Sequence, residues 1–244
     1  ETIKMIESND VEVVDYGLVD SNSRAFKTQE RMSGDGLDVI FCNMITYATS
    51  SVFAPIIKNE SSPVILVALQ PLKALDYNNA STLMQLKNDN ICSVPEFLGV
   101  ANRLGKKVFD VILGSLYDDP DAQKEIAEWC DIAKVLHSLK GARIGLMGHV
   151  LESMYDMHAD PTAVYETFGV HVPLLEIDDA VAEYNKVTEK EVSEKCELIC
   201  NEFSMPDPKS DPITTKLTDA DLQRSAKGAA ALDRLIKKYE LTGL

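Results

Sequence analysis

Side chains that could bind a small polar ligand are concentrated in the loop from His149 to Ala159. The loop follows a short apolar run, Ile144 to Met147, which is typical of a buried strand. In open α/β sheets, ligands bind just beyond the carboxyl ends of the strands. The loop is therefore predicted to line a ligand site, with Met154 as a contact residue. Its other candidate side chains are Tyr155, Asp156 and His158.

Asp156, His158 and Asp160 form the pattern D-x-H-x-D, which suggests a metal site. On a helix, however, His158 would point away from both aspartates. Asp160 is also needed to cap the helix that begins at Pro161. A metal site requires a third or fourth ligand, which the chain does not clearly supply. The pattern therefore favours a polar loop beside a ligand, and no metal ligand is predicted.

A second group of candidates follows two predicted strands nearer the N-terminus. Tyr47 comes after the apolar run Leu37 to Cys42, where its ring could stack on a sugar. The alternative is a tyrosine packed beneath a loop. Asp89 and Cys92 lie directly before a helix that the Ser93–Glu96 segment is expected to cap reciprocally. Small polar side chains at a helix start can bind sugar hydroxyls, although ordinary loops contain them too.

Other catalytic patterns are absent from the sequence or incomplete. Gly145 to Gly148 resembles part of a dinucleotide fingerprint, but the third glycine and the acidic residue are not placed correctly. No phosphate-binding Walker loop and no G-x-S-x-G nucleophile elbow occurs. His137 and His171 are interpreted as structural. The five cysteines are interpreted as reduced, mostly buried thiols.

The composition is that of a globular and acidic chain, with 244 residues, 45% hydrophobic residues and a net charge of −15. This charge opposes binding to nucleic acid and to anionic membranes, and the basic residues form no stripe. The longest apolar run, Val64 to Leu69, is too short to span a bilayer. No secretory pattern opens the chain. We therefore expect a soluble, cytoplasmic protein that binds neither nucleic acid nor membrane.

The elements that would position the candidate residues alternate between apolar strand patterns and amphipathic helix patterns. A long helix near 119–141 should bury a stripe that includes Trp129, and Thr218 with Asp221 should cap the last helix. This alternation predicts an α/β fold with two Rossmann-like domains, residues 1–141 and 142–244, whose mainly parallel sheets are flanked by helices. Strands are expected at 11–16, 37–42, 64–69, 108–113, 144–147 and 170–175.

Several of these motifs resemble L-arabinose isomerases and related L-fucose isomerase-like proteins. Arg143 to Phe168 is similar to the start of that family's middle domain, Thr46-Tyr47 to its Thr-aromatic pair and Glu96-Phe97 to its Glu-Phe pair. The resemblance implies a monosaccharide substrate, aldose–ketose isomerisation and a trimeric or hexameric homo-oligomer. It also implies Mn²⁺ as the cofactor of the full-length enzyme, where the ion stabilises an enediol while two acidic residues move protons.

Two departures from the family bear on the expected function. Asp89 and Cys92 stand where arabinose isomerases have a Gln and a His that reach the sugar, which argues against L-arabinose as the preferred substrate. The family's metal ligands, two Glu and two His, follow the middle domain, in a β-rich domain with no counterpart here. The family's first strand and helix have no counterpart either. We therefore expect no catalytic residue and no manganese site in this chain alone.

The leading interpretation is a fragment of a sugar isomerase that supplies surfaces for substrate contact and for oligomer formation. An alternative is a non-enzymatic sugar-binding module with two lobes. A third is a sensor or interaction protein whose acidic surface meets a basic partner. The predicted substrate contacts are Tyr47, Asp89, Cys92 and Met154.

Overall fold

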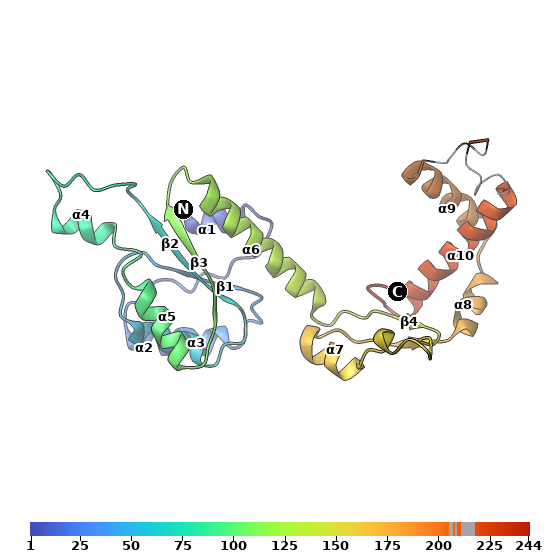
Figure 1. Cartoon of the computed structure of the whole chain (residues 1–244), viewed down its shortest axis with the longest axis horizontal. Helices are drawn as coiled ribbons and strands as arrows, with labels where there is room; N and C mark the ends of the chain where they lie inside the picture. Colours follow the sequence, from blue (N-terminus) through green and yellow to red (C-terminus); the bar gives the residue numbers. More distant parts are fainter. Residues whose placement is uncertain (205–206, 208, 211–217) are drawn as a thin grey trace. The chain divides into compact units, whose positions relative to one another are not determined.

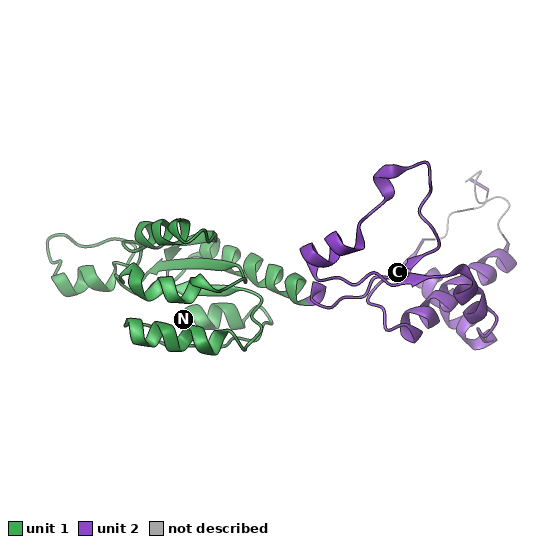
Figure 2. Cartoon of the chain, turned by 90° about the horizontal axis from the view of Figure 1, so that it is seen from below, with its two compact units in different colours: residues 1–137 green, residues 138–244 purple. Residues whose placement is uncertain are grey.

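The computed structural model (Figure 1) describes residues 1–204, 207, 209–210 and 218–244. Its contacts divide the chain into two compact units, Glu1–His137 and Ser138–Leu244 (Figure 2). The division falls slightly before the boundary expected at residue 141. Both units contain parallel strands flanked by helices, which confirms the predicted α/β class.

Unit 1, residues 1–137, is built on a three-stranded parallel sheet in the order β1-β2-β3. The central strand, β2, is buried from Val64 to Leu69, as expected of a strand that is covered on both faces. The three strands are β1 (Ile40–Asn43), β2 (Val64–Gln70) and β3 (Val108–Ser115).

Helices cover both faces of this sheet. The helices of this unit are α1 (Thr2–Glu7), α2 (Asn22–Met32), α3 (Ser50–Lys58), α4 (Thr82–Lys87), α5 (Val94–Arg103) and α6 (Pro120–Leu139), and all but α4 bury side chains. In Figure 1, α2, α3 and α5 lie on one face, and α1 and α6 lie on the other. Right-handed crossovers between successive parallel strands place the connecting helices, α3 and α5, on the same face.

Each face of the sheet has its own apolar cluster. On one face, the rings of Phe53 and Phe97 stack with their centroids 4.4 Å apart. On the other, Ile126 of α6 is fully buried, and Trp129 packs at the edge of the cluster. The Trp129 indole donates a hydrogen bond from Nε1 to Oδ2 of Asp110 at 2.8 Å. The predicted place of Trp129 against the sheet is confirmed, but the side chain is only partly buried.

The segment 11–16, predicted as a strand, forms no regular secondary structure. Val11 and Val13 still pack against the cluster beneath α6. An alternating apolar pattern indicates which side chains are buried. A strand also requires a neighbouring strand that hydrogen-bonds with its backbone. In the part of the chain that the structure describes, this segment pairs with no such edge, so the strand prediction was wrong.

Unit 2, residues 138–244, contains a smaller parallel sheet. Single parallel bridges extend it, joining Arg143 to His171 and Ile144 to Gly243. The predicted strands at 144–147 and 170–175 therefore lie where expected but are shorter. The two strands of this smaller sheet are β4 (Leu146–Met147) and β5 (Leu174–Leu175).

Two helices of unit 2 begin at the residues that the sequence indicated. The Asp160 carboxylate accepts a hydrogen bond from the Thr162 N–H, and Gly169 ends the same helix with a left-handed φ of 71°. Thr218 and Asp221 form the predicted capping box. None of the described helices is long and apolar enough to cross a membrane. The helical segments are η1 (Tyr155–Met157), α7 (Pro161–Phe168), α8 (Ile177–Tyr184), α9 (Glu189–Glu202) and α10 (Asp219–Lys238).

Candidate functional site

Three of the four predicted contact residues lie at one edge of the sheet in unit 1. Tyr47 follows β1, while Asp89 and Cys92 lie between β2 and α5, beyond the carboxyl ends of both strands. They lie close to one another, because Asp89 raises the pKa of the Cys92 thiol and Cys92 contributes to the raised pKa of the Tyr47 hydroxyl. The fourth residue, Met154, belongs to unit 2.

Glu96, which the sequence assigned to helix capping, belongs to the same group. Its Oε2 accepts a hydrogen bond from the Tyr47 hydroxyl at 3.3 Å, and its Oε1 accepts one from the Ser50 N–H at 2.8 Å. Ser93 likewise accepts from the Ala48 N–H at 2.7 Å and makes no capping bond to α5. The predicted capping box is therefore wrong. Both side chains instead satisfy backbone N–H groups of the loop between β1 and α3, which lies against α5.

These contacts set the ionisation states of the group. The Ser50 N–H, followed by the Tyr47 hydroxyl, holds the pKa of Glu96 below its usual range, so the carboxylate is charged at neutral pH. The negative charge of Glu96 raises the pKa of Tyr47. Partial desolvation by neighbouring atoms, followed by the Asp89 carboxylate, raises the pKa of the exposed Cys92 thiol. The group can donate and accept hydrogen bonds, but it holds no activated thiolate nucleophile.

Two asparagines hold the loop before α5 against the ends of β1 and β2. Asn90 is 3% exposed and donates through Nδ2 to the Met44 carbonyl at 2.6 Å. The Asn88 carbonyl accepts a hydrogen bond from Nε2 of Gln70 at 2.9 Å. These bonds fix the backbone of the loop while Cys92 stays exposed.

In unit 2, a cavity of about 310 Å³ lies beyond the carboxyl ends of β4 and β5. His149, His158 and Glu176 supply its polar side chains, next to apolar residues of both strands. Met154 belongs to the loop that borders the cavity and is 40% exposed, but it does not line the cavity. The sequence indicated this loop as part of a site, but it did not indicate Glu176, which only the pairing of β5 with β4 brings beside the loop.

The described part of the chain contains no group of three or more His, Cys, Asp or Glu side chains placed to hold a metal ion. Asp160 of the D-x-H-x-D pattern caps α7, as expected. The described residues therefore do not offer a donor set that fits a manganese ion.

Comparison with known proteins indicates a distant relationship to sugar isomerases. The chain is 22% identical over 142 residues to the L-arabinose isomerase of Pediococcus pentosaceus, and the aligned segment covers 58% of this chain and 30% of that protein. It is 26% identical over 110 residues to the L-arabinose isomerase of Nocardioides sp., and this aligned segment covers 45% of this chain and 22% of that protein. The matches thus span less than a third of these curated relatives. No protein-family model matches the chain.

Proposed function

We propose that this protein recognises a monosaccharide as part of an aldose–ketose isomerase. The observation that carries the proposal is the hydrogen-bonded pair of Glu96 and Tyr47, which lies with Asp89 and Cys92 at the carboxyl edge of a parallel sheet. The weak similarity to L-arabinose isomerases supports a sugar as the ligand and isomerisation as the reaction class.

The group offers hydrogen bonding and an apolar surface that suit a sugar. A carboxylate has about four acceptor sites, so Glu96 can still accept from sugar hydroxyls after binding Ser50 and Tyr47. Asp89 adds a second acceptor. The Tyr47 side chain is 46% exposed, and its ring provides a flat apolar face for the C–H groups of a sugar. These residues would bind and orient the substrate.

The resemblance to L-arabinose and L-fucose isomerases adds a manganese ion and self-association to the proposal. Homo-oligomer formation would use apolar surface such as that around α4, a helix with no buried residue. Tyr77 and Leu83 in this region are 88% and 61% exposed. Sedimentation velocity measurements test the self-association.

A non-enzymatic sugar-binding module is the second candidate. The raised pKa values of Tyr47 and Cys92 favour it, because both groups stay protonated at neutral pH. The lowered pKa of Glu96 keeps that carboxylate ionised. A general acid or base works best when its pKa is near the working pH, and none of these three shifts moves a pKa in that direction.

Calorimetric titration with a panel of pentoses and hexoses tests the proposed site. Glu96→Gln removes the charged acceptor and is expected to weaken sugar binding about tenfold, since hydrogen bonds to charged groups are the stronger ones. Glu30→Gln makes the same charge change on an exposed residue of α2 and should leave binding unchanged. Unchanged sugar binding by Glu96→Gln would refute the site. Formation of the isomeric sugar by the proposed parent enzyme with added manganese distinguishes the isomerase from the binding module.

A further inference from the structure

A second cavity in unit 1, of about 230 Å³, lies at the opposite edge of the sheet, where β2 and β3 begin. Its walls come from the segment that follows α3 and from the segment that joins α5 to β3. Most of its accessible lining is polar, in contrast to the cavity of unit 2. The lining residues that bear on its chemistry are Glu60, Ser61, Ser62, Lys106, Lys107 and Phe109.

Two successive backbone N–H groups in this cavity converge on one anionic oxygen. The N–H groups of Ser61 and Ser62 both donate to Oε1 of Glu60, each at 2.9 Å. Successive N–H groups that converge in this way form a concavity that binds anions. Here a carboxylate of the chain itself fills the concavity, so this segment is already built to hold a negatively charged oxygen.

Two lysines, Lys106 and Lys107, line the same cavity. Nζ of Lys106 donates to the backbone carbonyl of Glu60 at 2.9 Å, and it forms no ion pair with the carboxylate. Nζ of Lys107 lies over the Phe109 ring, 4.6 Å from its centroid. Among the residues that the structure describes, neither lysine forms an ion pair, although the chain carries a net charge of −15. Their positive charge is therefore available to a ligand.

A β-bulge brings an aromatic ring to this cavity. Val64 of β2 pairs with Val108 of β3, but the next residue, Ile65, pairs with Asp110, so Phe109 is an extra residue without a partner. Bulges redirect a side chain and are over-represented next to functional sites. The Phe109 side chain is 46% exposed and forms an apolar wall beside the lysines.

We propose that this cavity binds the phosphoryl group of a small phosphorylated metabolite. Lys106 and Lys107 supply positive charge, and the N–H groups of Ser61 and Ser62 supply the hydrogen bonds that Glu60 now takes. A phosphoryl dianion can engage more of these donors than a single carboxylate can. The cavity is smaller than the about 300–1,000 Å³ of pockets for drug-sized ligands, which limits the ligand to a few carbon atoms. The Glu60 carboxylate then competes with the phosphoryl group for the N–H groups of Ser61 and Ser62.

Titration with glycerol 3-phosphate, followed by the NMR shifts of the Ser61 and Ser62 amides, tests the proposal. Saturable shifts are expected, with glycerol giving none and inorganic phosphate giving weaker ones. Lys107→Gln leaves the Lys106 hydrogen bond intact and should weaken binding about tenfold. Lys124→Gln makes the same charge change on an exposed lysine of α6 and should leave binding unchanged. Equal weakening by both variants, or amides that do not shift, would overturn the proposal.

Glu60→Gln separates a built site from general attraction between charges. The amide oxygen of Gln can still accept the two N–H groups, so the fold of the segment should persist. Removing the competing negative charge should tighten glycerol 3-phosphate binding about tenfold. Glu30→Gln, with the same charge change elsewhere in unit 1, should leave the affinity unchanged. Binding that is not tightened by Glu60→Gln contradicts the role of Glu60 as a competitor and, with it, the site. The outcome is independent of sugar binding, since the two sites lie at opposite edges of the sheet.

Discussion

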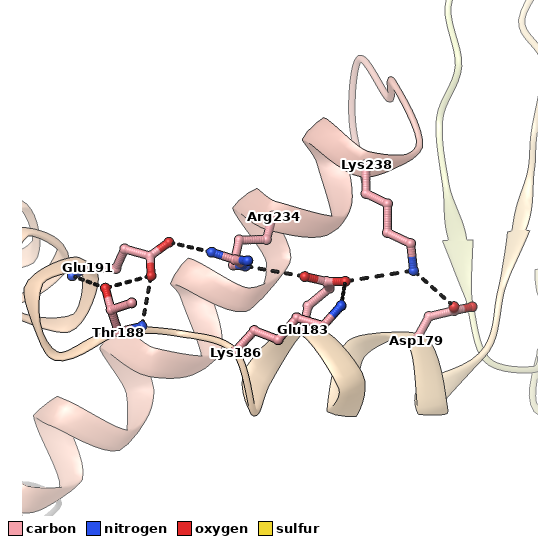
Figure 3. A network of polar contacts seen from close by, with 7 residues as sticks. All are labelled: Asp179, Glu183, Lys186, Thr188, Glu191, Arg234 and Lys238. Carbon is pink, nitrogen blue, oxygen red and sulfur yellow. Dashed lines mark hydrogen bonds and ion pairs between the residues drawn. The ribbon is translucent and has the colours of Figure 1, made fainter.

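Each of the two units of this protein is stabilised internally by a different kind of interaction. In unit 1, the strand β2, which is buried from Val64 to Leu69, lies between apolar clusters on both faces of its sheet. In unit 2, the strands are short, and charged side chains connect the helices α8, α9 and α10 (Figure 3). Apolar burial responds little to pH, whereas the strength of ion pairs depends on both pH and salt. The units should therefore lose their structure under different conditions.

Arg234 on α10 is the centre of this charged network. Its Nε donates to Oε2 of Glu183 at 3.2 Å, and its Nη1 donates to Oε1 of Glu191 at 2.9 Å. The Glu183 side chain is 6% exposed and also contacts the ammonium groups of Lys186 and Lys238. These contacts join three helices in a unit whose longest helix buries mostly small residues. The buried residues of α10 are Ala226, Ala230, Ala231 and Leu235.

The largest effect should follow from a cavity in the core of unit 1. Phe53→Ala removes a ring that is 2% exposed and stacked on Phe97, and it should destabilise unit 1 by about 3–5 kcal/mol. Trp129 is the only tryptophan and lies in unit 1, so its fluorescence during urea denaturation reports this unit alone. Phe26→Ala, at a side chain that is 59% exposed, is the matched control. Equal midpoints for the two variants would show that Phe53 is not a core residue.

A smaller effect, confined to unit 2, should follow from breaking the charged network. Arg234→Met leaves the buried Glu183 carboxylate with fewer partners and should lower the melting temperature that circular dichroism reports for unit 2. The transition seen by Trp129 fluorescence should stay in place. Arg224→Met, at a side chain that is 71% exposed and paired with Asp221 of its own helix, should change little. A shift of the fluorescence transition by Arg234→Met would contradict the conclusion that the charged network stabilises unit 2 alone.

Acid should distinguish the units without any mutation. Hydrogen bonds from Thr188, followed by the one from Arg234, lower the pKa of Glu191 from 4.5 to about 2 in the folded chain. A carboxyl group with a depressed folded pKa contributes stability above its unfolded pKa and loses it as the pH falls. Unit 2 should therefore weaken between pH 4.5 and about 2, the range that these two pKa values define. Helical circular dichroism should fall before Trp129 emission changes, and Glu191→Gln should flatten this pH dependence.

The smallest effect on stability is expected at the surface of unit 1, where sugar selectivity should change instead. An ionised Asp89 accepts but cannot donate hydrogen bonds, and Cys92 is smaller than a histidine and donates weakly. We therefore expect the proposed sugar site to prefer a six-carbon sugar over L-arabinose. The double variant Asp89→Gln with Cys92→His should shift relative affinity toward L-arabinose, measured by calorimetry with both sugars. Tightest binding of L-arabinose by the unmodified chain would contradict this reading of the two positions.

Local chemistry in the sequence determined a large part of the fold. The run from Val64 to Leu69 indicated a strand buried on both faces, because an apolar stretch with no polar face has to be covered. Asp160 marked the start of α7, and Thr218 marked the start of α10, because a cap and the N–H groups that it accepts lie within one turn. The candidate residues around Tyr47 were also found in this way, since a loop after a strand lies at the carboxyl edge of its sheet.

Only the tertiary structure decided where polar groups with several possible partners bind. Ser93 and Glu96 have the spacing of a capping box, yet they accept N–H groups of Ala48 and Ser50, more than forty residues away. Arg234 joins α8 to α9 across a similar separation in sequence. The segment 11–16 has a strand pattern but no strand to pair with. A sequence shows which groups need partners, but the partners that they find depend on which distant segments the fold brings beside them.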